Sequence, residues 1–198
     1  MTPLFGLLLA GGSSSRMRSD KAALAYGARP QLAEAFDLLA RHVGKAFVSV
    51  RSDQATEPLR ARYPQVVDGN VGRGPIAGIV AAQERHPEAA WLVLACDLPF
   101  LDDATLASLI ARRDASRLAT AFASRHDGLP EPLCALYEPA SRPAILAHVA
   151  GGRDCPRKFL VDHDVLLLDP VSPAALDNAN TPEDAAAARA ALAGRGAA

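Results

Sequence analysis

The sequence has no excess of basic residues and no long hydrophobic run. It carries 21 Lys and Arg against 22 Asp and Glu, for a net charge of −1, whereas a general nucleic-acid binder normally shows a basic excess. No apolar run reaches the length of about 20 residues that a membrane-spanning helix needs. We therefore expect neither a nucleic-acid partner nor a membrane segment.

Cysteine is also scarce. The chain has three, Cys96, Cys134 and Cys155; the number is odd, and no two have the spacing of a zinc site. Since only Cys155 stands in a polar stretch, we expect it alone to be exposed. The sequence indicates reduced thiols in a cytoplasmic protein.

The chain shows no linker-like stretch and no internal repeat. Its 198 residues, 49% of them hydrophobic, suit one domain with one sizeable core. We expect a single domain over residues 1–198 with an Ala-rich tail from about residue 190. Because that tail has little to bury, it is expected to fray near Gly194.

Apolar runs of strand length recur along the chain and are mostly continuous, which is typical of strands buried on both faces. Their ranges are 4–10, 46–50, 66–67, 91–96, 118–123, 133–137 and 165–168. Helical patterns follow Pro30, Pro75 and Asp103, and a last helix begins after Thr181, which forms a capping box with Asp184. The alternation predicts an α/β fold with a mostly parallel sheet.

In such a sheet, ligands bind at the carboxyl ends of the strands. That rule points to the loops that follow Ala10, Val50, Val67, Cys96 and Tyr137. We expect the functional residues to stand in or beside these loops.

The first of these loops has the features of a phosphate-binding turn. Residues 4–21, LFGLLLAGGSSSRMRSDK, pass from an apolar run through Gly11 and Gly12 to Arg16 and Lys21. Glycine lets the backbone approach an anion closely, and exposed amides supply partial positive charge. Arg16 and Lys21 are candidates to neutralise a triphosphate and its leaving pyrophosphate, and each also fits a solvated surface charge.

Other interpretations of this stretch fit less well. A P-loop needs a glycine directly before its lysine and a dinucleotide fingerprint needs GxGxxG, and neither pattern occurs here. A signal-peptide core followed by a serine linker is a further alternative. Against it, no Lys or Arg precedes the apolar run.

Asp97 directly follows the apolar run 91–96. A carboxylate at the end of a buried strand points to the ligand crevice, and its natural role is an oxygen ligand for Mg²⁺, which prefers one or two carboxylates plus phosphate oxygens. A helix cap is the alternative. We favour the metal because Asp102 and Asp103 already serve the start of the next helix.

Asp68 follows Val67 in the same way and precedes a glycine-rich segment that contains Gly74 and Gly78. Small residues there would let a base or ribose lie against the backbone. An ordinary loop with a helix start explains the segment equally well.

Two later loops are weaker candidates. The loop Asp127–Pro132 is a candidate lining for the site of a second substrate, and ordinary turn chemistry also explains it. Asn178 and Asn180 are candidates to reach the crevice, and as helix-entry residues they need no function.

Together these stretches resemble the molybdenum cofactor guanylyltransferase family over nearly the whole chain. LLLAGGSSSRMRSDKAAL is similar to the family's LAGGxSxRMGxDKxxL opening, and the later motifs follow in order as GPIAG, CDLPFL, EPLCALY and NANTPED. The resemblance implies a three-layer, Rossmann-like (GT-A-like) nucleotidyltransferase fold. It also implies transfer of GMP from GTP to the phosphate of molybdopterin carrying molybdenum, with release of pyrophosphate. The dinucleotide product would pass to apo-enzymes or to carriers such as molybdoenzyme chaperones and molybdenum-insertion proteins.

The resemblance also implies site residues by matching positions. GTP would be held by Leu9, Ala10, Gly11 and Lys21. With Gly12, Asp68, Gly74, Gly78 and Asp97, these residues make up the nucleotide site that we predict. Asp68 would contact the nucleoside, and Asp97 would bind Mg²⁺ and the phosphates. From the residues themselves, we predict that Arg16, Lys21 and Asp97 carry the catalysis. For the acceptor's phosphate, Arg153, Arg157 and Lys158 are basic candidates that fit a solvated face equally well.

One position departs from the family pattern, because Arg18 stands where the family has glycine. Arg18 either forces a different loop path or adds a cation over the phosphates. Two other functions therefore stay open. One is a nucleotidyltransferase of other specificity, such as cytidylyl transfer to the molybdenum cofactor or to a sugar phosphate. The other is a non-catalytic nucleotide- or pterin-binding relative.

Overall fold

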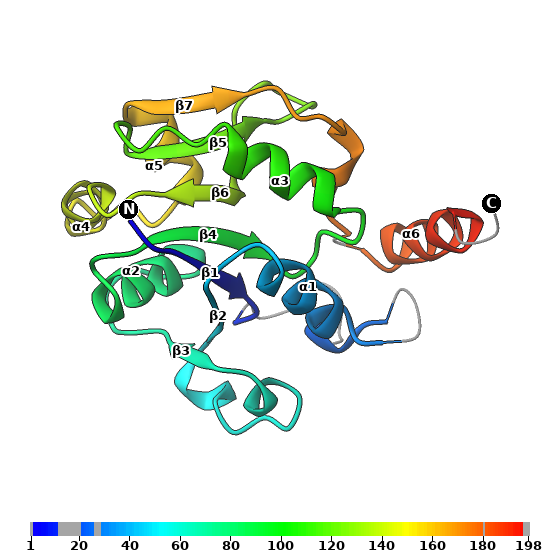
Figure 1. Cartoon of the computed structure of the whole chain (residues 1–198). Helices are drawn as coiled ribbons and strands as arrows, with labels where there is room; N and C mark the ends of the chain where they lie inside the picture. Colours follow the sequence, from blue (N-terminus) through cyan, green and yellow to red (C-terminus); the bar gives the residue numbers. More distant parts are fainter. Residues whose placement is uncertain (1, 12–20, 26–28, 180, 196–198) are drawn as a thin grey trace.

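A seven-stranded sheet in the order β3-β2-β1-β4-β6-β5-β7 forms the centre of the molecule (Figure 1). The computed structural model describes residues 2–11, 21–25, 29–179 and 181–195. The strands are β1 (Leu4–Leu9), β2 (Lys45–Val50), β3 (Gln65–Val67), β4 (Ala90–Ala95), β5 (Ala119–Ala123), β6 (Pro130–Tyr137) and β7 (Val165–Leu168). Each apolar run that predicts a strand contributes one of them.

Within the described sheet, β6 alone runs against the other strands. β1 pairs in parallel with β2 and β4, β2 with β3, and β5 with β7. β6 pairs antiparallel with both β4 and β5, which therefore share one direction. The prediction of an α/β fold with a mostly parallel sheet is confirmed.

The reversed direction of β6 corrects one prediction. Because β6 runs backwards, Tyr137 ends it at the edge opposite to the carboxyl ends of the other strands. The loop after Tyr137 therefore does not line the predicted ligand crevice. At the crevice edge, β6 instead contributes its first residues, Pro130 and Glu131, which continuous apolar patterning alone does not place in a strand.

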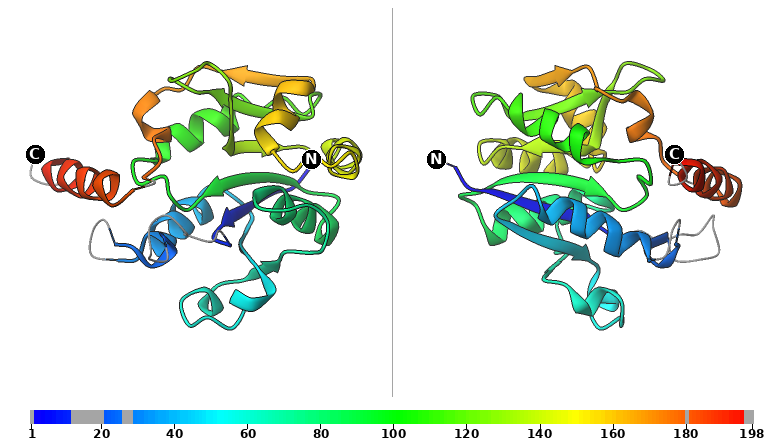
Figure 2. Two further views of the ribbon diagram at one scale, coloured as in Figure 1. Left: turned by 180° about the vertical axis from the view of Figure 1, so that it is seen from behind. Right: turned by 45° about the vertical axis from the view of Figure 1, so that its right-hand side comes forward.

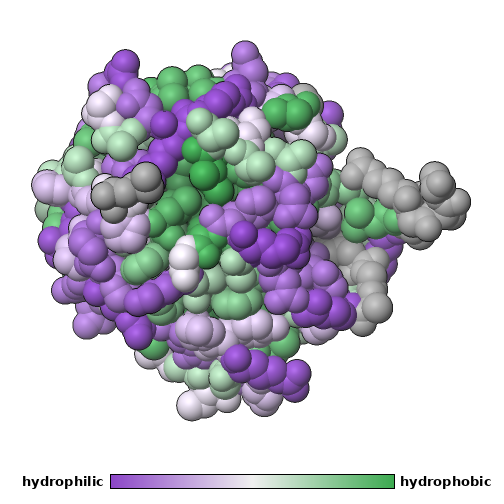
Figure 3. All heavy atoms as spheres, in the orientation of Figure 1, coloured by the Kyte–Doolittle hydropathy of each residue, from purple (hydrophilic) through white to green (hydrophobic). Residues whose placement is uncertain are grey.

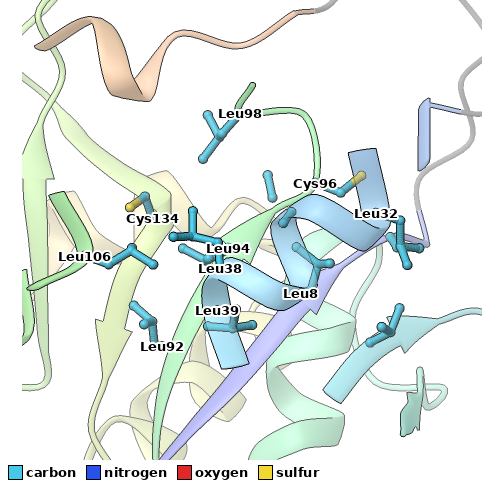
Figure 4. Close-up of a cluster of buried hydrophobic side chains, with 14 of the residues drawn as sticks. Leu8, Leu32, Leu38, Leu39, Leu92, Leu94, Cys96, Leu98, Leu106 and Cys134 are labelled. Carbon is cyan, nitrogen blue, oxygen red and sulfur yellow. The ribbon is translucent and has the colours of Figure 1, made fainter. Parts of the chain in front are cut away.

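Helices cover both faces of the sheet and make three layers (Figures 1 and 2). The longer helices are α1 (Gln31–Ala40), α2 (Pro75–Arg85), α3 (Asp103–Ala111), α4 (Ser141–Ala150), α5 (Pro156–Asp162) and α6 (Pro182–Arg195). Since successive side chains of a strand point to opposite faces, Leu8 packs with α1 and α3, while Leu7 packs with α2, α4 and α5. The first of these two cores is drawn in Figure 4.

Apolar spacing does not predict α4 and α5. The buried residues of α4 are Ser141, Ile145 and His148, which have helical spacing, but two of the three are polar. α5 spans seven residues and is too short to show a repeating stripe. An apolar pattern finds a helix only where the buried face is apolar and extends over several turns.

The helix α6 begins as its sequence predicts. The Thr181 amide donates to Asp184 Oδ2 at 2.9 Å and the Asp184 amide donates to Thr181 Oγ1 at 3.1 Å, so the predicted capping box is confirmed. The helix extends from the end of the sheet (Figure 1), and Arg189 Nε donates to the Ala25 carbonyl at 2.8 Å. It is described past Gly194, where composition predicts fraying, to Arg195.

None of the helices in the described part of the chain is long and apolar enough to cross a bilayer. Hydrophobic residues reach the surface in the middle of one face, among hydrophilic ones (Figure 3). All three cysteines are free, and Cys155 alone is exposed, as predicted. Burial raises the pKa of the Cys134 thiol to about 12, which keeps it protonated and unreactive at neutral pH.

Gly6 sets the distance between α1 and the sheet, and it provides a test of this packing. A Cβ at Gly6 would lie 2.6 Å from Leu39 Cγ, and Leu39 is fully buried. We expect Gly6→Ala to lower the free energy of unfolding by about 1–3 kcal/mol through overpacking, measured by urea denaturation. Gly44→Ala is the control, since the nearest atom to its Cβ is 3.6 Å away. Equal losses in the two variants would contradict this account.

Candidate functional site

The carboxyl ends of β1 to β4 lie side by side because these strands are parallel neighbours. Leu9 is in register with Ser49 of β2 and with Ala95 of β4. Gly11, Asp68 and Asp97 follow β1, β3 and β4 within two residues of the strand ends. In the strand order, Gly11 therefore stands between the two carboxylates, with Asp68 on the β2–β3 side and Asp97 on the β4 side.

Asp68 is fixed by a hydrogen bond from β2. Ser49 Oγ donates to Asp68 Oδ1 at 2.6 Å, and a Cβ at Gly11 would lie 3.3 Å from Asp68 Oδ2. Burial raises the pKa of Asp68, while the hydrogen bond from Ser49 and the charge of Arg51 act in the opposite direction. The side chain of Asp68 therefore reaches across β2 to the loop that follows β1.

The two glycines of the segment before and within α2 have different positions. Gly74 has a φ of 63°, and a Cβ there would meet nothing, so the left-handed backbone is what favours glycine. Gly78 is buried inside α2, and a Cβ there would overlap Ser49 Oγ. Gly78 thus lets α2 approach the sheet at the point where Ser49 holds Asp68.

Two arginines at this edge are not predicted from the sequence. Arg51 directly follows β2 and donates from Nη1 to the Gly11 carbonyl at 2.8 Å, while Nε and Nη2 bind Asp53 at 3.0 and 2.9 Å. Arg60 is 1% exposed, and its Nε and Nη2 lie 3.1 and 2.9 Å from the Ala10 carbonyl oxygen. The position after an apolar strand is a usable signal for Arg51. No sequence pattern marks Arg60, which lies in the short helix η3 (Arg60–Arg62).

Asp97 is half-buried at the end of β4, and its carbonyl accepts a hydrogen bond from the Ala179 amide at 3.1 Å. The alternative role of a cap for α3 is wrong, because Asp102 Oδ1 accepts from the Thr105 amide at 2.8 Å. The described residues contain no group of three or more His, Cys, Asp or Glu that would hold a metal alone. A single carboxylate still fits Mg²⁺, whose remaining ligands are commonly phosphate oxygens and water.

Part of the predicted site lies outside the described residues. This is the case for Gly12, Arg16, Arg18 and Asn180. Lys21 begins the short helix η1 (Lys21–Ala23), and its side chain is not among those described. The roles of Arg16 and Lys21 stay predictions.

A cleft of about 620 Å³ lies between the amino end of β6, α5 and α6. Its lining is Phe100, Ser124, His126, Asp127, Glu131, Arg157, Leu176, Asp177, Asn178, Ala179, Asp184, Ala187, Ala188 and Ala191. The structure thus brings together the two weaker candidate loops, one with Asp127 and Glu131 and the other with Asp177 and Asn178. A pocket of about 90 Å³ adjoins the cleft through Glu131, Arg157, Leu176 and Asn178.

Ion pairs hold the cleft walls in place. Arg157 binds Asp127 through Nη1 and Glu131 through Nη2, both at 3.0 Å. Arg125 forms a bidentate pair with Asp177 at 2.8 and 2.7 Å. Of the three basic candidates for an acceptor phosphate, Arg157 lines the cleft. Arg153 instead pairs with Asp162 at 3.1 Å, and Lys158 is absent from the described lining.

The sequence is similar to proteins of molybdenum cofactor synthesis. It is 35% identical over 183 residues to a molybdenum cofactor biosynthesis bifunctional protein of Synechocystis, covering 92% of this chain and 53% of that protein. The chain therefore spans about half the length of that relative. It is also 30% identical over 187 residues to a probable molybdenum cofactor guanylyltransferase of Trichormus variabilis, covering 94% of this chain and 90% of that protein.

Solved structures share the fold. Molybdopterin-guanine dinucleotide biosynthesis protein A of Archaeoglobus fulgidus has a TM-score of 0.79 at 21% identity, over 96% of this chain and 98% of that one. A CMP:2-keto-3-deoxy-manno-octonic acid synthetase complexed with CTP has 0.72 at 12%, over 98% and 99%. The manganese complex of Rv0371C from Mycobacterium tuberculosis has 0.68 at 18%, over 96% and 99%.

Because these structures are at most 21% identical to this chain, the comparison establishes the fold alone, which is that of nucleotidyltransferases. The family follows from a separate finding. A family model described as MobA-like NTP transferase domain matches residues 6–166, which contain the candidate nucleotide site from Leu9 to Asp97. The chain belongs to the MobA-like NTP transferase family.

Proposed function

We propose that this chain transfers GMP from GTP to the phosphate of molybdopterin carrying molybdenum, forming molybdopterin guanine dinucleotide and pyrophosphate. The observation that carries the proposal is the loop after β1, where Gly11 stands between Asp68 and Asp97 in a member of the MobA-like family. A cleft of about 620 Å³ beyond β4 offers room for an acceptor. The names of relatives at about 30% identity support this specificity.

In this proposal the nucleotide lies along the loop after β1, with Leu9, Ala10, Gly11 and Lys21 as its ligands and Asp68 at the nucleoside. A carboxylate accepts hydrogen bonds from N1–H and the 2-amino group of guanine, which cytosine does not offer in that arrangement. Ser49 donates to one Asp68 oxygen at 2.6 Å, and this contact fixes the carboxylate in advance.

The reaction needs positioning and charge neutralisation more than acid–base chemistry. An oxygen of the acceptor phosphate bonds to the α-phosphorus of GTP, and the bond from that phosphorus to the pyrophosphate oxygen breaks. The acceptor phosphate is already an anion, so no general base is needed. Lys21 and Arg16 stabilise the leaving pyrophosphate in this proposal. Mg²⁺, held by Asp97 and phosphate oxygens, would neutralise phosphate charge.

We assign the acceptor to the cleft between β6, α5 and α6. Its described lining includes four acidic residues, Asp127, Glu131, Asp177 and Asp184, against Arg157 and His126. Such a lining suits a pterin, whose ring carries several N–H donors, better than it suits a polyanion. Arg157 would serve the single phosphate of the acceptor.

Nucleotide preference is the first test of the proposal. We expect GTP with Mg²⁺ to raise the melting temperature more than CTP, ATP or UTP, because a ligand at 100 times its Kd adds about 2.7 kcal/mol of stability. Differential scanning fluorimetry measures this. A larger shift with CTP would favour the cytidylyl alternative, which the fold of the CTP-bound neighbour keeps open.

Asp97 provides the test of catalysis. We expect Asp97→Asn to reduce kcat on the order of a hundredfold or more, because it removes a charge at the phosphates without changing shape. Pyrophosphate release from GTP and molybdopterin carrying molybdenum is the measurement. Asp103→Asn is the control, since Asp103 is exposed and pairs with Arg41 at 2.9 Å away from the crevice. Native turnover by Asp97→Asn would refute the assignment. Tight GTP binding without product from the unaltered protein would favour a non-catalytic relative.

Arg157 tests the acceptor site. We expect Arg157→Gln to raise the KM for the acceptor about tenfold, the effect of losing one hydrogen bond to a charged group, and to leave the KM for GTP unchanged. Steady-state kinetics with each substrate varied separates the two constants. Arg153→Gln is the matched control, because Arg153 pairs with Asp162 outside the cleft. A change in the GTP constant alone would contradict the assignment.

A further inference from the structure

We infer that Arg60 is a positioning residue of the loop after β1, because its guanidinium fixes the Ala10–Gly11 peptide so that the Gly11 amide faces the β4 side of the crevice. The inference deepens the proposed function and rests on its nucleotide site. Arg60 lies in none of the sequence motifs, and the fold brings it to the loop.

Arg60 is held on both sides of its guanidinium. Nε and Nη2 donate to the Ala10 carbonyl oxygen at 3.1 and 2.9 Å, and Nη1 lies 3.0 Å from Glu57 Oε2. Glu57 also accepts from the amides of Leu59 and Arg60 at 3.1 and 3.0 Å. Burial acts to raise the pKa of Glu57, but these hydrogen bonds and the charge of Arg60 hold it below its ordinary value. Glu57 thus stays ionised and aligns the guanidinium.

The guanidinium takes the place of a sheet hydrogen bond. The Ala10 amide donates to the Ser49 carbonyl at 3.2 Å, as in a parallel ladder. The next ladder donor, the Arg51 amide, turns away and donates to Gln54 Oε1 at 3.2 Å. The Ala10 carbonyl therefore receives Arg60 from the β2–β3 connection instead of a backbone N–H from β2.

The direction of the Gly11 amide follows from peptide geometry. No cis peptide bond occurs in the described chain, and in a trans peptide the C=O and the following N–H point in opposite directions. The Ala10 carbonyl faces Arg60 on the β2 side, so the Gly11 N–H faces the β4 side, where Asp97 follows. Within the described residues this N–H has no protein acceptor.

The next carbonyl is held from the same side. Arg51 Nη1 donates to the Gly11 carbonyl at 2.8 Å, so two arginines of the β2–β3 connection bind two consecutive carbonyls of the loop. Carbonyl oxygens repel phosphates, whereas a fixed N–H is a phosphate ligand. A donor fixed before the ligand arrives binds without a cost for reorganisation.

The test compares a nucleoside triphosphate with its nucleoside, since positioning of an amide for phosphate affects the triphosphate alone. Arg60→Lys keeps the charge and removes the fork that spans the carbonyl. We expect it to weaken binding of GTP with Mg²⁺ about tenfold and that of guanosine less than twofold, by NMR titration of the full chain. Arg62→Lys, at the other end of the same short helix and exposed, is the matched control and should change neither.

A second readout needs no ligand. The Gly11 ¹⁵N resonance reports the hydrogen bond on its own peptide carbonyl, so Arg60→Lys should shift it and Arg62→Lys should not. Equal losses for triphosphate and nucleoside would indicate a merely structural role and overturn the inference. An unmoved Gly11 resonance would overturn it as well.

A second variant and a second nucleotide test the role of Arg60 where the first experiment cannot. If Arg60→Lys does not fold, Glu57→Gln removes the carboxylate that aligns Arg60, and we expect the same phosphate-dependent loss at smaller size. If the unaltered protein prefers CTP, the proposed guanylyl specificity fails, and the comparison of CTP with cytidine still decides the role of Arg60.

Discussion

The parallel pairing of β1 with both β2 and β4 is the constraint on which the rest of the structure depends. It brings the ends of these strands to one edge and so places Gly11 between carboxylates that lie 57 and 86 residues later in the chain. Backbone hydrogen bonds fix this arrangement and leave the side chains at the edge available. Ser49, Arg51 and Arg60 then orient the edge. The contacts of Arg51 and Arg60 with the loop after β1 depend on the pairing of β1 with β2, and the contact of Ser49 with Asp68 depends on the pairing of β2 with β3.

Much of this architecture is predictable, because burial on both faces makes a strand continuously apolar. The runs before Gly11, Asp68 and Asp97 each form a strand, and the carboxyl-edge rule brings these three residues together. The direction of β6 is not predictable from its apolar run, since a run of this kind has no polarity. For this reason the carboxyl-edge rule predicts the wrong edge for the loop after Tyr137.

What the sequence does not predict is the set of contacts made by polar side chains with the backbone. Arg60 lies among charged residues in a short connection and looks like a surface cation, yet it is 1% exposed. Gly78 fits a ligand-facing position in the motif GPIAG, but its missing side chain faces Ser49. In both cases the contact that explains the residue is made with a distant segment of the chain, and the sequence pattern around the residue does not indicate that contact.

The candidate nucleotide site and the neighbouring cleft draw on different parts of the sequence. The candidate nucleotide residues lie between Leu9 and Asp97. The residues that line the neighbouring cleft and its adjoining pocket all lie at Leu98 or later in the sequence. The hydrogen bond from the Ala179 amide to the Asp97 carbonyl connects the two parts. If the proposed donor and acceptor sites are right, changes in the second part would alter the choice of acceptor without changing the residues that hold the nucleotide. A new acceptor specificity would then require changes in one contiguous segment of the chain only.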